Sequence, residues 1–250
     1  MRALHFVKPL EYQLETAGEQ YMGGTALTGT LALTNRGGTP AKDLRLEVAL
    51  GFAVFRDLKE RGPDALNILA TQTLAEGLAL DPAQTHKAAW SFDLPLDFPI
   101  SSKVSGPFFL YGGAVGDPAN RGLIDLPVDL LPAMASFISI LENHHAFLAR
   151  EPRHAEGGLE VKFKAPDRYP TVDDLTAHLV MEGDTLHMAF TATGRAIQPG
   201  QGGKLGKREN HTERSVAWKE FSPSPASPNR GLYREVWQSV LTEIAPRLAD

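Results

Sequence analysis

Two histidines, His178 and His187, lie at a spacing that could let their imidazole rings bind one transition-metal ion. They flank Gly183-Asp184, which predicts a two-residue turn between two strands of alternating apolar and polar residues. One register places all the apolar side chains of both strands on one face. It pairs Met181 with Leu186, Leu179 with Met188 and Ala177 with Phe190. The histidines are then diagonal neighbours about 7–8 Å apart on the other face. Because no carboxylate occupies an adjacent strand position, we expect two ordinary outer-face histidines and no metal site.

His144, His145 and His154 form a second group of potential metal ligands. Adjacent residues on a helix point about 100° apart, so His144 and His145 cannot both reach one ion from the middle of a helix. The chain also contains no cysteine, which excludes disulfides, Cys-zinc sites, iron–sulfur clusters and thiol catalysis. We therefore expect neither a metal nor a cofactor.

The glycine-rich segment 200–207 resembles a phosphate-binding loop only superficially. Counting back from Gly206-Lys207, Gln201 stands where that motif requires glycine, and Arg208 stands where it requires Ser or Thr. We expect a hairpin loop here. The sequence also lacks the G-x-S-x-G, HExxH and EF-hand spacings, so no catalytic constellation is predicted.

Basic residues gather beside this loop, although the chain as a whole has a net charge of −5. The cluster consists of Lys204, Lys207, Arg208 and Arg214. It could contact an acidic protein surface, a phosphate or lipid headgroups, whereas Glu209 and Glu213 dilute its charge and favour a solvated loop. The overall negative charge gives no attraction to nucleic acid or to an anionic membrane.

The elements that would position these residues are mostly strands. Up to residue 131, short alternating segments are separated by turns without intervening helices, which predicts an antiparallel β-sandwich. Segments 27–34 and 44–50 are expected to pair with each other across the turn-rich loop 35–40. Residues 57–67 interrupt the β pattern and predict a loop with a short helix.

A helix is predicted to open the second domain at Pro132, a residue that suits the first helical turn. Its apolar residues follow the i, i+3, i+4, i+7 pattern of one helical stripe. They are Met134, Phe137, Ile138 and Leu141. Strands resume at residue 159 and end near Val216 and Trp218, which predicts a second, smaller β-sandwich.

The tail, residues 222–250, is predicted to form a Pro/Ser linker followed by an amphipathic helix. Tyr233 and Trp237 lie on its apolar stripe. Because an isolated helix of this length is marginal in water, the stripe needs a partner surface. One alternative is docking on the second domain of the same chain. The other is a contact with a partner, either a second copy or another protein, in which Tyr233 and Trp237 bind that partner.

Several of these segments resemble the first domain of arrestin-fold proteins. They are residues 19–33, the strand 44–50, Pro107-Phe108-Phe109 and the run 126–132. The helix after Pro132 and the strand 186–190 resemble the second domain of a bacterial branch, the sporulation-control family. The resemblance covers roughly residues 12–220 and rests on the pattern and order of segments. It implies two β-sandwiches, an intracellular location and a non-enzymatic regulatory or adaptor role.

Together these observations predict an all-β protein of two antiparallel β-sandwich domains with an arrestin-like fold. The domains would span residues 1–131 and 132–221, with a helix leading the second domain, and 222–250 would carry the C-terminal amphipathic helix. No apolar run approaches the roughly 18 residues needed to span a bilayer. We expect a cytoplasmic adaptor that binds other proteins through strand edges and loops, and not an enzyme.

Two other functions are open at this stage. A small-molecule or carbohydrate-binding β-sandwich would need exposed aromatic residues, for which Trp90, Tyr111 and Trp218 are the candidates. An enzyme would need a pocket lined by histidine with a carboxylate within hydrogen-bond reach. A homo-oligomer formed through the C-terminal helix is a further open alternative.

Overall fold

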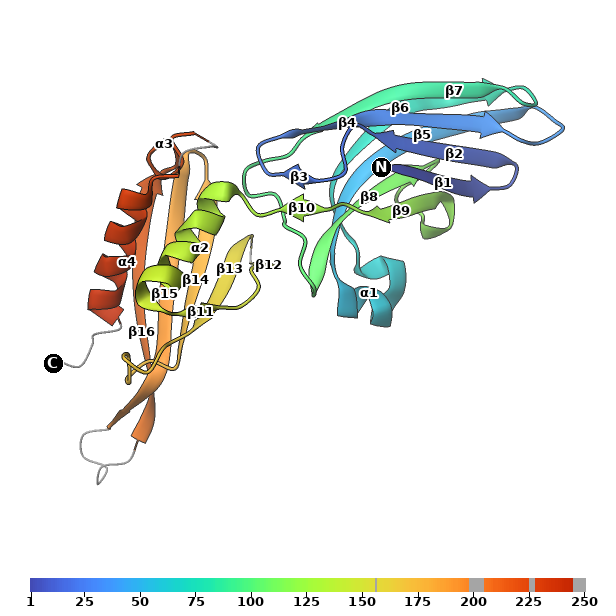
Figure 1. The fold of residues 1–250 in the computed structure, drawn as a ribbon. Coiled ribbons are helices and arrows are strands. Elements are labelled where there is room, and N and C mark those ends of the chain that lie inside the picture. The colour runs from blue at the N-terminus through green and yellow to red at the C-terminus, as the bar shows by residue number, and fades with distance from the viewer. Residues whose placement is uncertain (156, 198–204, 225–227, 245–250) are drawn as a thin grey trace. The chain divides into compact units, whose positions relative to one another are not determined.

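The computed structural model describes residues 1–155, 157–197, 205–224 and 228–244, with the backbone alone at 195–197 and 205–207. The chain divides into two compact units, Met1–Asp129 and Leu130–Asp250. They are coloured blue to green and green to red in Figure 1. The predicted boundary, between residues 131 and 132, lies next to this division. Most described residues are in antiparallel strands, which confirms the predicted all-β class.

Unit 1 is a sandwich of two four-stranded antiparallel sheets. The first sheet has the order β1-β2-β4-β7, with bounds Arg2–Val7, Leu10–Thr16, Ala26–Asn35 and Thr85–Asp93. The second has the order β6-β5-β8-β9, with bounds Asn67–Leu80, Ala41–Val54, Ser105–Gly112 and Arg121–Asp125. A short parallel pair, β3 (Tyr21–Met22) with β10 (Val128–Asp129), accompanies them.

The core of unit 1 lies between its sheets, because each strand turns alternate residues inward. Leu31, Trp90 and Phe109 are among its buried side chains. A second, smaller cluster lies on the outer face of the second sheet, where Leu58 of α1 (Phe55–Arg61) packs near Phe108. The 3₁₀ turns η1 (Gly62–Ala65) and η2 (Pro118–Asn120) complete the unit. Helix α1 and η1 confirm the short helix predicted within 57–67.

The predicted pairing of segments 27–34 and 44–50 is wrong. These segments lie in β4 and β5, which belong to different sheets. The loop between them is fixed as a crossover by Asn35, whose side chain is fully buried. Its Nδ2 donates to the carbonyls of Thr39 (2.8 Å) and Leu80 (2.9 Å), and its Oδ1 accepts from the N–H of Gly37 (2.9 Å). These bonds hold the chain where it passes from one sheet to the other.

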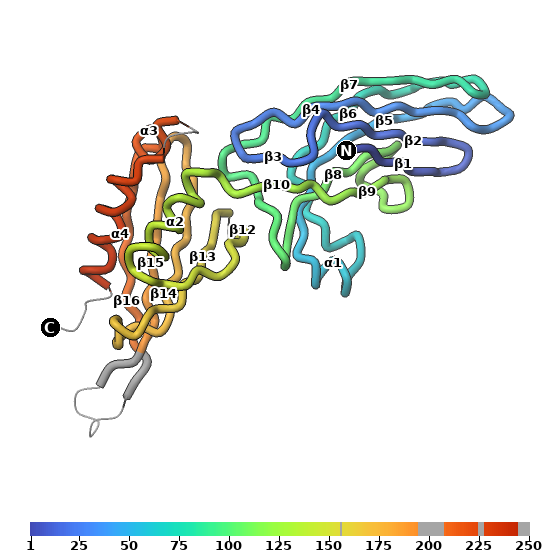
Figure 2. Tube along the Cα trace, in the orientation of Figure 1, coloured from blue at the N-terminus to red at the C-terminus, as the bar shows by residue number. Residues whose placement is uncertain are grey.

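The described residues of unit 2 form one sheet of order β11-β13-β14-β15-β16, with β12 also paired to β13. The bounds are Leu148–Ala149, Arg153–Ala155, Gly158–Lys164, Asp174–Glu182, Thr185–Ile197 and Leu205–Ala217 for β11 to β16. The register predicted for the β14–β15 hairpin is confirmed at all three pairs, including Met181 opposite Leu186. Figure 2 traces this hairpin beside β16.

Two helices cover one face of this sheet, α2 (Pro132–His145) and α4 (Arg230–Ile244), as Figure 1 shows. Where the sequence predicted a second sheet, these helices form the second layer. Their large buried side chains fill this layer, since Trp237 of α4 packs on Phe163 and Phe190 of the sheet and Phe137 of α2 stacks on Trp237. Trp218, expected in the last strand, instead begins the short helix α3 (Trp218–Phe221).

Candidate binding surfaces

Tyr233 and Trp237, the two aromatic residues predicted to bind a partner, are both fully buried in unit 2. Trp237 Nε1 donates a 2.8 Å hydrogen bond to the backbone carbonyl of Phe137. Tyr233 Oη donates a 2.5 Å bond to the backbone carbonyl of Phe221, and burial raises the pKa of Tyr233 to about 12. The tail helix therefore docks on its own chain. This corrects the alternative in which these two side chains contact a partner, because no part of either is left for one.

The predicted basic cluster on β16 is only partly described. Arg214 faces α4, where its Nη2 donates to Glu243 (2.7 Å) and Ser239 (2.7 Å). The hydrogen bond from Arg214 to the Glu243 carboxylate lowers the pKa of Glu243. Arg208 is exposed and donates from Nε to Asn210 Oδ1 (3.0 Å). Lys204 lies outside the described residues, and of Lys207 only the backbone pairing with Arg195 is described. Arg214 thus joins β16 to α4, while partner binding by the cluster stays a prediction.

The histidines considered as metal ligands bond to other groups. A ring nitrogen of His178 lies 2.9 Å from the carbonyl oxygen of Ala155, and His187 Nδ1 lies 2.9 Å from Ser215 Oγ. His145 is buried, with Nδ1 3.3 Å from Tyr169 Oη. Within the described ranges, no group of three or more His, Cys, Asp or Glu side chains is arranged to hold a metal ion.

The aromatic residues considered for carbohydrate binding do not form an exposed surface. Trp90 and Tyr111 are buried in the core of unit 1. Trp218 is half-buried and stacks on Phe221, with ring centroids 5.7 Å apart. These candidates are therefore wrong as a sugar-stacking platform, because stacking needs an exposed ring face.

The edge strand β1 presents the most exposed apolar residues of unit 1. Leu4 is 59% exposed and Phe6 is 60% exposed. They share the outer face of the strand, because Ala3 and Val7 alternate with them and pack toward the core. Among the described residues, β1 forms a backbone ladder with β2 alone. The strand thus offers a free edge with two large apolar side chains beside it.

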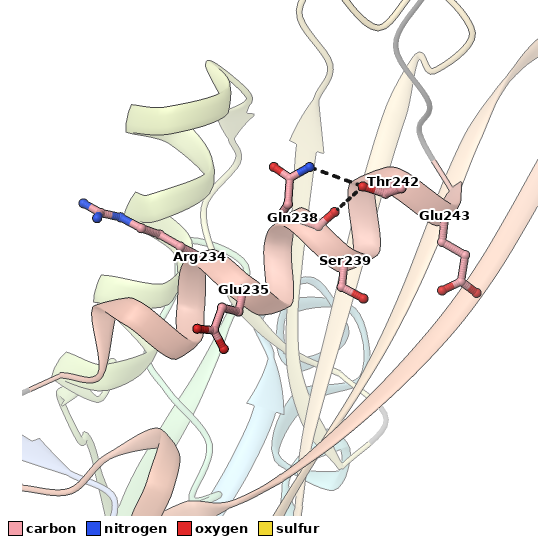
Figure 3. A pocket seen from close by; sticks show the side chains of 6 residues that line it. All are labelled: Arg234, Glu235, Gln238, Ser239, Thr242 and Glu243. Atoms are coloured by element: carbon pink, nitrogen blue, oxygen red, sulfur yellow. Dashed lines mark hydrogen bonds between the residues drawn. The ribbon is translucent and has the colours of Figure 1, made fainter.

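A shallow, widely open hollow of about 770 Å³ lies on the outer face of α4, and all of its lining residues belong to this helix. Figure 3 shows its lining side chains, which are Arg234, Glu235, Gln238, Ser239, Thr242 and Glu243. The middle of this hollow is polar but uncharged. Gln238 Nε2 donates to Thr242 Oγ1 (3.3 Å), and Thr242 Oγ1 donates to the carbonyl of Gln238 (2.7 Å). The charged residues of the hollow lie at its two ends, Arg234 and Glu235 at one and Glu243 at the other.

His144 joins two arginines at the Arg234 end of this hollow. Arg234 Nη2 lies 3.3 Å from His144 Nε2, and Arg168 Nη2 donates to the backbone carbonyl of His144 (3.2 Å). All three side chains are exposed. In the part of the chain that the structure describes, no carboxylate forms an ion pair with Arg168 or Arg234. Sequence reasoning missed this trio because its members come from α2, the β13–β14 connection and α4, which share no local motif.

Comparison with known proteins identifies the fold. No family model matches the chain, and no curated protein matches it. The crystal structure of Spo0M, a sporulation control protein from Bacillus subtilis, aligns over 94% of this chain and 99% of that chain with a TM-score of 0.65. The two sequences are 15% identical, so the likeness concerns the fold. It confirms the predicted arrestin-like fold and the resemblance to sporulation-control proteins.

Two further structures match about half of the chain. One is the alkylpurine DNA glycosylase AlkC of Pseudomonas fluorescens, with a TM-score of 0.32, 13% identity and coverage of 49% of this chain and 31% of that chain. The other is a β-glucosidase of Listeria innocua, with a TM-score of 0.31, 13% identity and coverage of 48% of this chain and 16% of that chain. Scores this low support no functional inference.

Within the described residues, no helix is long and apolar enough to cross a membrane.

Proposed function

We propose that this chain is a non-enzymatic, cytoplasmic adaptor or regulatory protein that binds a protein partner through the free edge of β1. The Spo0M fold supports the regulatory part of the proposal, because the alignment includes both units and nearly the whole of each chain. Spo0M itself is a sporulation control protein. For the present chain we propose only the general role, that of a regulator acting by binding.

The observation that carries the proposal is the exposed β1 edge. Natural sheets usually protect an edge strand with charges, prolines or a covering element, because unpaired N–H and C=O groups attract another strand. On β1, Arg2 supplies a charge at one end, and Lys8-Pro9 ends the strand at the other. Between these ends Leu4 and Phe6 are exposed. The sheet face beside the centre of the edge is therefore apolar, and in the described part of the chain no further strand pairs with this edge.

An extended segment of a partner can pair with such an edge by strand addition. The backbone hydrogen bonds give affinity, and alternate side chains give specificity. Leu4 and Phe6 are two residues apart, so side chains on one face of the added strand would cover both. The preferred segment would carry apolar residues at positions i and i+2.

Site-specific photo-crosslinking tests this proposal. A benzophenone amino acid is placed at position 6, or at position 148 as the control, and crosslinked proteins are identified from the native host. Leu148 suits the control because it is 67% exposed and lies in unit 2. We expect a partner that crosslinks at position 6 and not at position 148.

Binding of that purified partner is then compared between Leu4→Ser/Phe6→Ser and Leu148→Ser. Burying a leucine or phenylalanine contributes about 1.5–3 kcal/mol, so the double variant should weaken binding at least about tenfold. The control should bind as the wild type does. Identical crosslinking at the two positions, or an unchanged Kd in the double variant, would refute the role of β1.

A further inference from the structure

We propose that the hollow on α4, together with the Arg168–His144–Arg234 trio at its end, binds a short peptide segment with an acidic end and an uncharged body. The site belongs to unit 2 and is separate from the β1 edge. It rests on the proposed function in one respect, namely that the ligand is a segment of a protein.

The trio supplies the part of the site that receives the acidic end. Guanidinium groups present several N–H donors in a planar fork that suits carboxylates. Each arginine uses one Nη2 on His144, so its other N–H groups are left for a ligand. His144 lies in the last turn of α2, and both guanidiniums are anchored on this one residue. Two cations from different segments thus contact the same residue, Arg168 at its backbone carbonyl and Arg234 at its ring, with no carboxylate pairing with either in the described part of the chain.

The hollow supplies the part of the site that receives the uncharged body. Gln238 and Thr242 bond to each other and Ser239 Oγ accepts from Arg214, which leaves the Gln238 carbonyl oxygen, its second N–H and the Ser239 hydroxyl proton for a peptide backbone. Figure 3 shows these side chains following one another along α4, with Arg234 extending to one side. An extended segment rises about 3.3 Å per residue, so several residues can lie along the helix while an acidic side chain reaches the trio.

The charges of the hollow argue for a peptide rather than for a polyanion. Glu235 lies beside Arg234, and Glu243 lies toward the other end. A ligand that is negative along its whole length, such as a nucleic acid, would meet the carboxylate of Glu235 and, at the other end, that of Glu243, which already pairs with Arg214. A ligand that is negative at one end only would meet the arginines with that end and the neutral side chains with the rest. Charge complementarity therefore selects the latter.

The test measures fluorescence anisotropy of labelled octapeptide pools on the full chain. One pool has Asp-Asp at its first two positions and the other at its last two, and the remaining six positions are randomised among uncharged residues. Matched pools carry Asn-Asn instead. We expect at least one Asp-Asp pool to bind and its Asn-Asn counterpart to bind much more weakly. Equal binding of matched pools, or no binding of either Asp-Asp pool, would overturn the proposal.

Two substitutions, Arg168→Gln and Arg234→Gln, locate the site. Exposed ion pairs contribute modestly, so we expect each to weaken peptide binding about two- to fivefold and the double variant about tenfold. Arg61→Gln is the matched control, because Arg61 is an exposed arginine on α1 of unit 1. An unchanged Kd in the double variant, or equal weakening in the control, would overturn the assignment.

Two further measurements distinguish this peptide site from a site for small oxyanions and from binding at the β1 edge. Inorganic phosphate as competitor should displace the Asp-Asp pool only at concentrations where its ionic strength alone explains the loss. Specific competition at low concentration would mean that the trio is a small-oxyanion site and would overturn the peptide ligand. The Leu4→Ser/Phe6→Ser variant should bind the Asp-Asp pool as the wild type does. The β1 proposal and the α4 proposal can therefore be refuted independently of each other.

Discussion

The Trp237 indole stacks on the Phe137 ring, with centroids 4.5 Å apart and planes 18° apart, and its Nε1 donates to the carbonyl of Phe137. One residue of the tail helix thus makes both an aromatic and a polar contact with the helix that opens unit 2. The last helix is therefore part of the core of this unit and cannot act as a detachable arm without exposing that core.

We predict that Trp237→Phe destabilises the protein by about 2 kcal/mol, because the hydrogen bond is lost and part of the buried indole volume is left empty. Urea unfolding followed by circular dichroism measures the change. Gln238→Ala, on the exposed side of the same helix, should stay within about 0.5 kcal/mol of the wild type. If Trp237→Phe were as stable as this control, the contact with Phe137 would not contribute to stability.

A second prediction concerns Gly29, which occupies an apolar position of β4. A Cβ atom at this position would collide with the carbonyl oxygen of Glu15 and the ring of Trp90. We expect Gly29→Ala to destabilise unit 1 by about 1–3 kcal/mol, because the core must shift to admit one methyl group. Gly38→Ala is the control, since a methyl group there would meet no described atom within 4 Å beyond its chain neighbours. A comparable loss of thermal stability in both variants would contradict the explanation.

A third prediction concerns the crossover between the sheets of unit 1. Asn35→Asp replaces two buried N–H donors with a carboxylate that faces the carbonyls of Thr39 and Leu80. We expect a loss of about 3 kcal/mol, because the buried carboxylate would keep only the Gly37 N–H as a donor and would place its other oxygen against two carbonyl oxygens. Asn67→Asp is a matched change at an exposed residue of β6 and should cost little. Chemical unfolding of the two variants tests the difference, and equal stabilities would exclude this role for Asn35.

The sequence predicted local register better than the assignment of strands to sheets. In the β14–β15 hairpin, both strands bury one face and Gly183-Asp184 fixes the turn, so only one register satisfies the apolar pattern. For β4 and β5 the same alternation shows that each strand has a buried face but not which sheet it joins. The buried bonds of Asn35 decide that, and they involve Leu80, which is 45 residues further along the chain.

The binding surfaces were harder to predict for a related reason. The apolar stripe of the tail helix indicated that it needs a partner surface, and the structure identifies that surface as α2 and the sheet of unit 2. The trio of Arg168, His144 and Arg234 gives no signal in the sequence, because Arg234 is 90 residues away from His144. Only the packing of α4 beside α2 brings them together.

The last prediction is a dependence of stability on alkaline pH. Burial raises the pKa of Tyr233 from an ordinary value of 10.0 to about 12 in the folded protein. The neutral phenol is thus favoured by folding, and its contribution is fully present below pH 10. Between about pH 10 and pH 12 the unfolded chain loses this proton and the folded chain keeps it, so stability falls as pH rises, by about 1–2 kcal/mol for this group.

Tyr233→Phe isolates that contribution from those of the other tyrosines. The variant loses the hydrogen bond from Oη to the carbonyl of Phe221, which should cost about 1 kcal/mol near neutral pH. It has no proton to lose above pH 10, so its stability should fall less steeply there, and the two profiles should converge toward pH 12. Unfolding free energies measured from pH 8 to pH 12 test this. Parallel profiles over that range would show that the pKa of Tyr233 is the same in the folded and unfolded states.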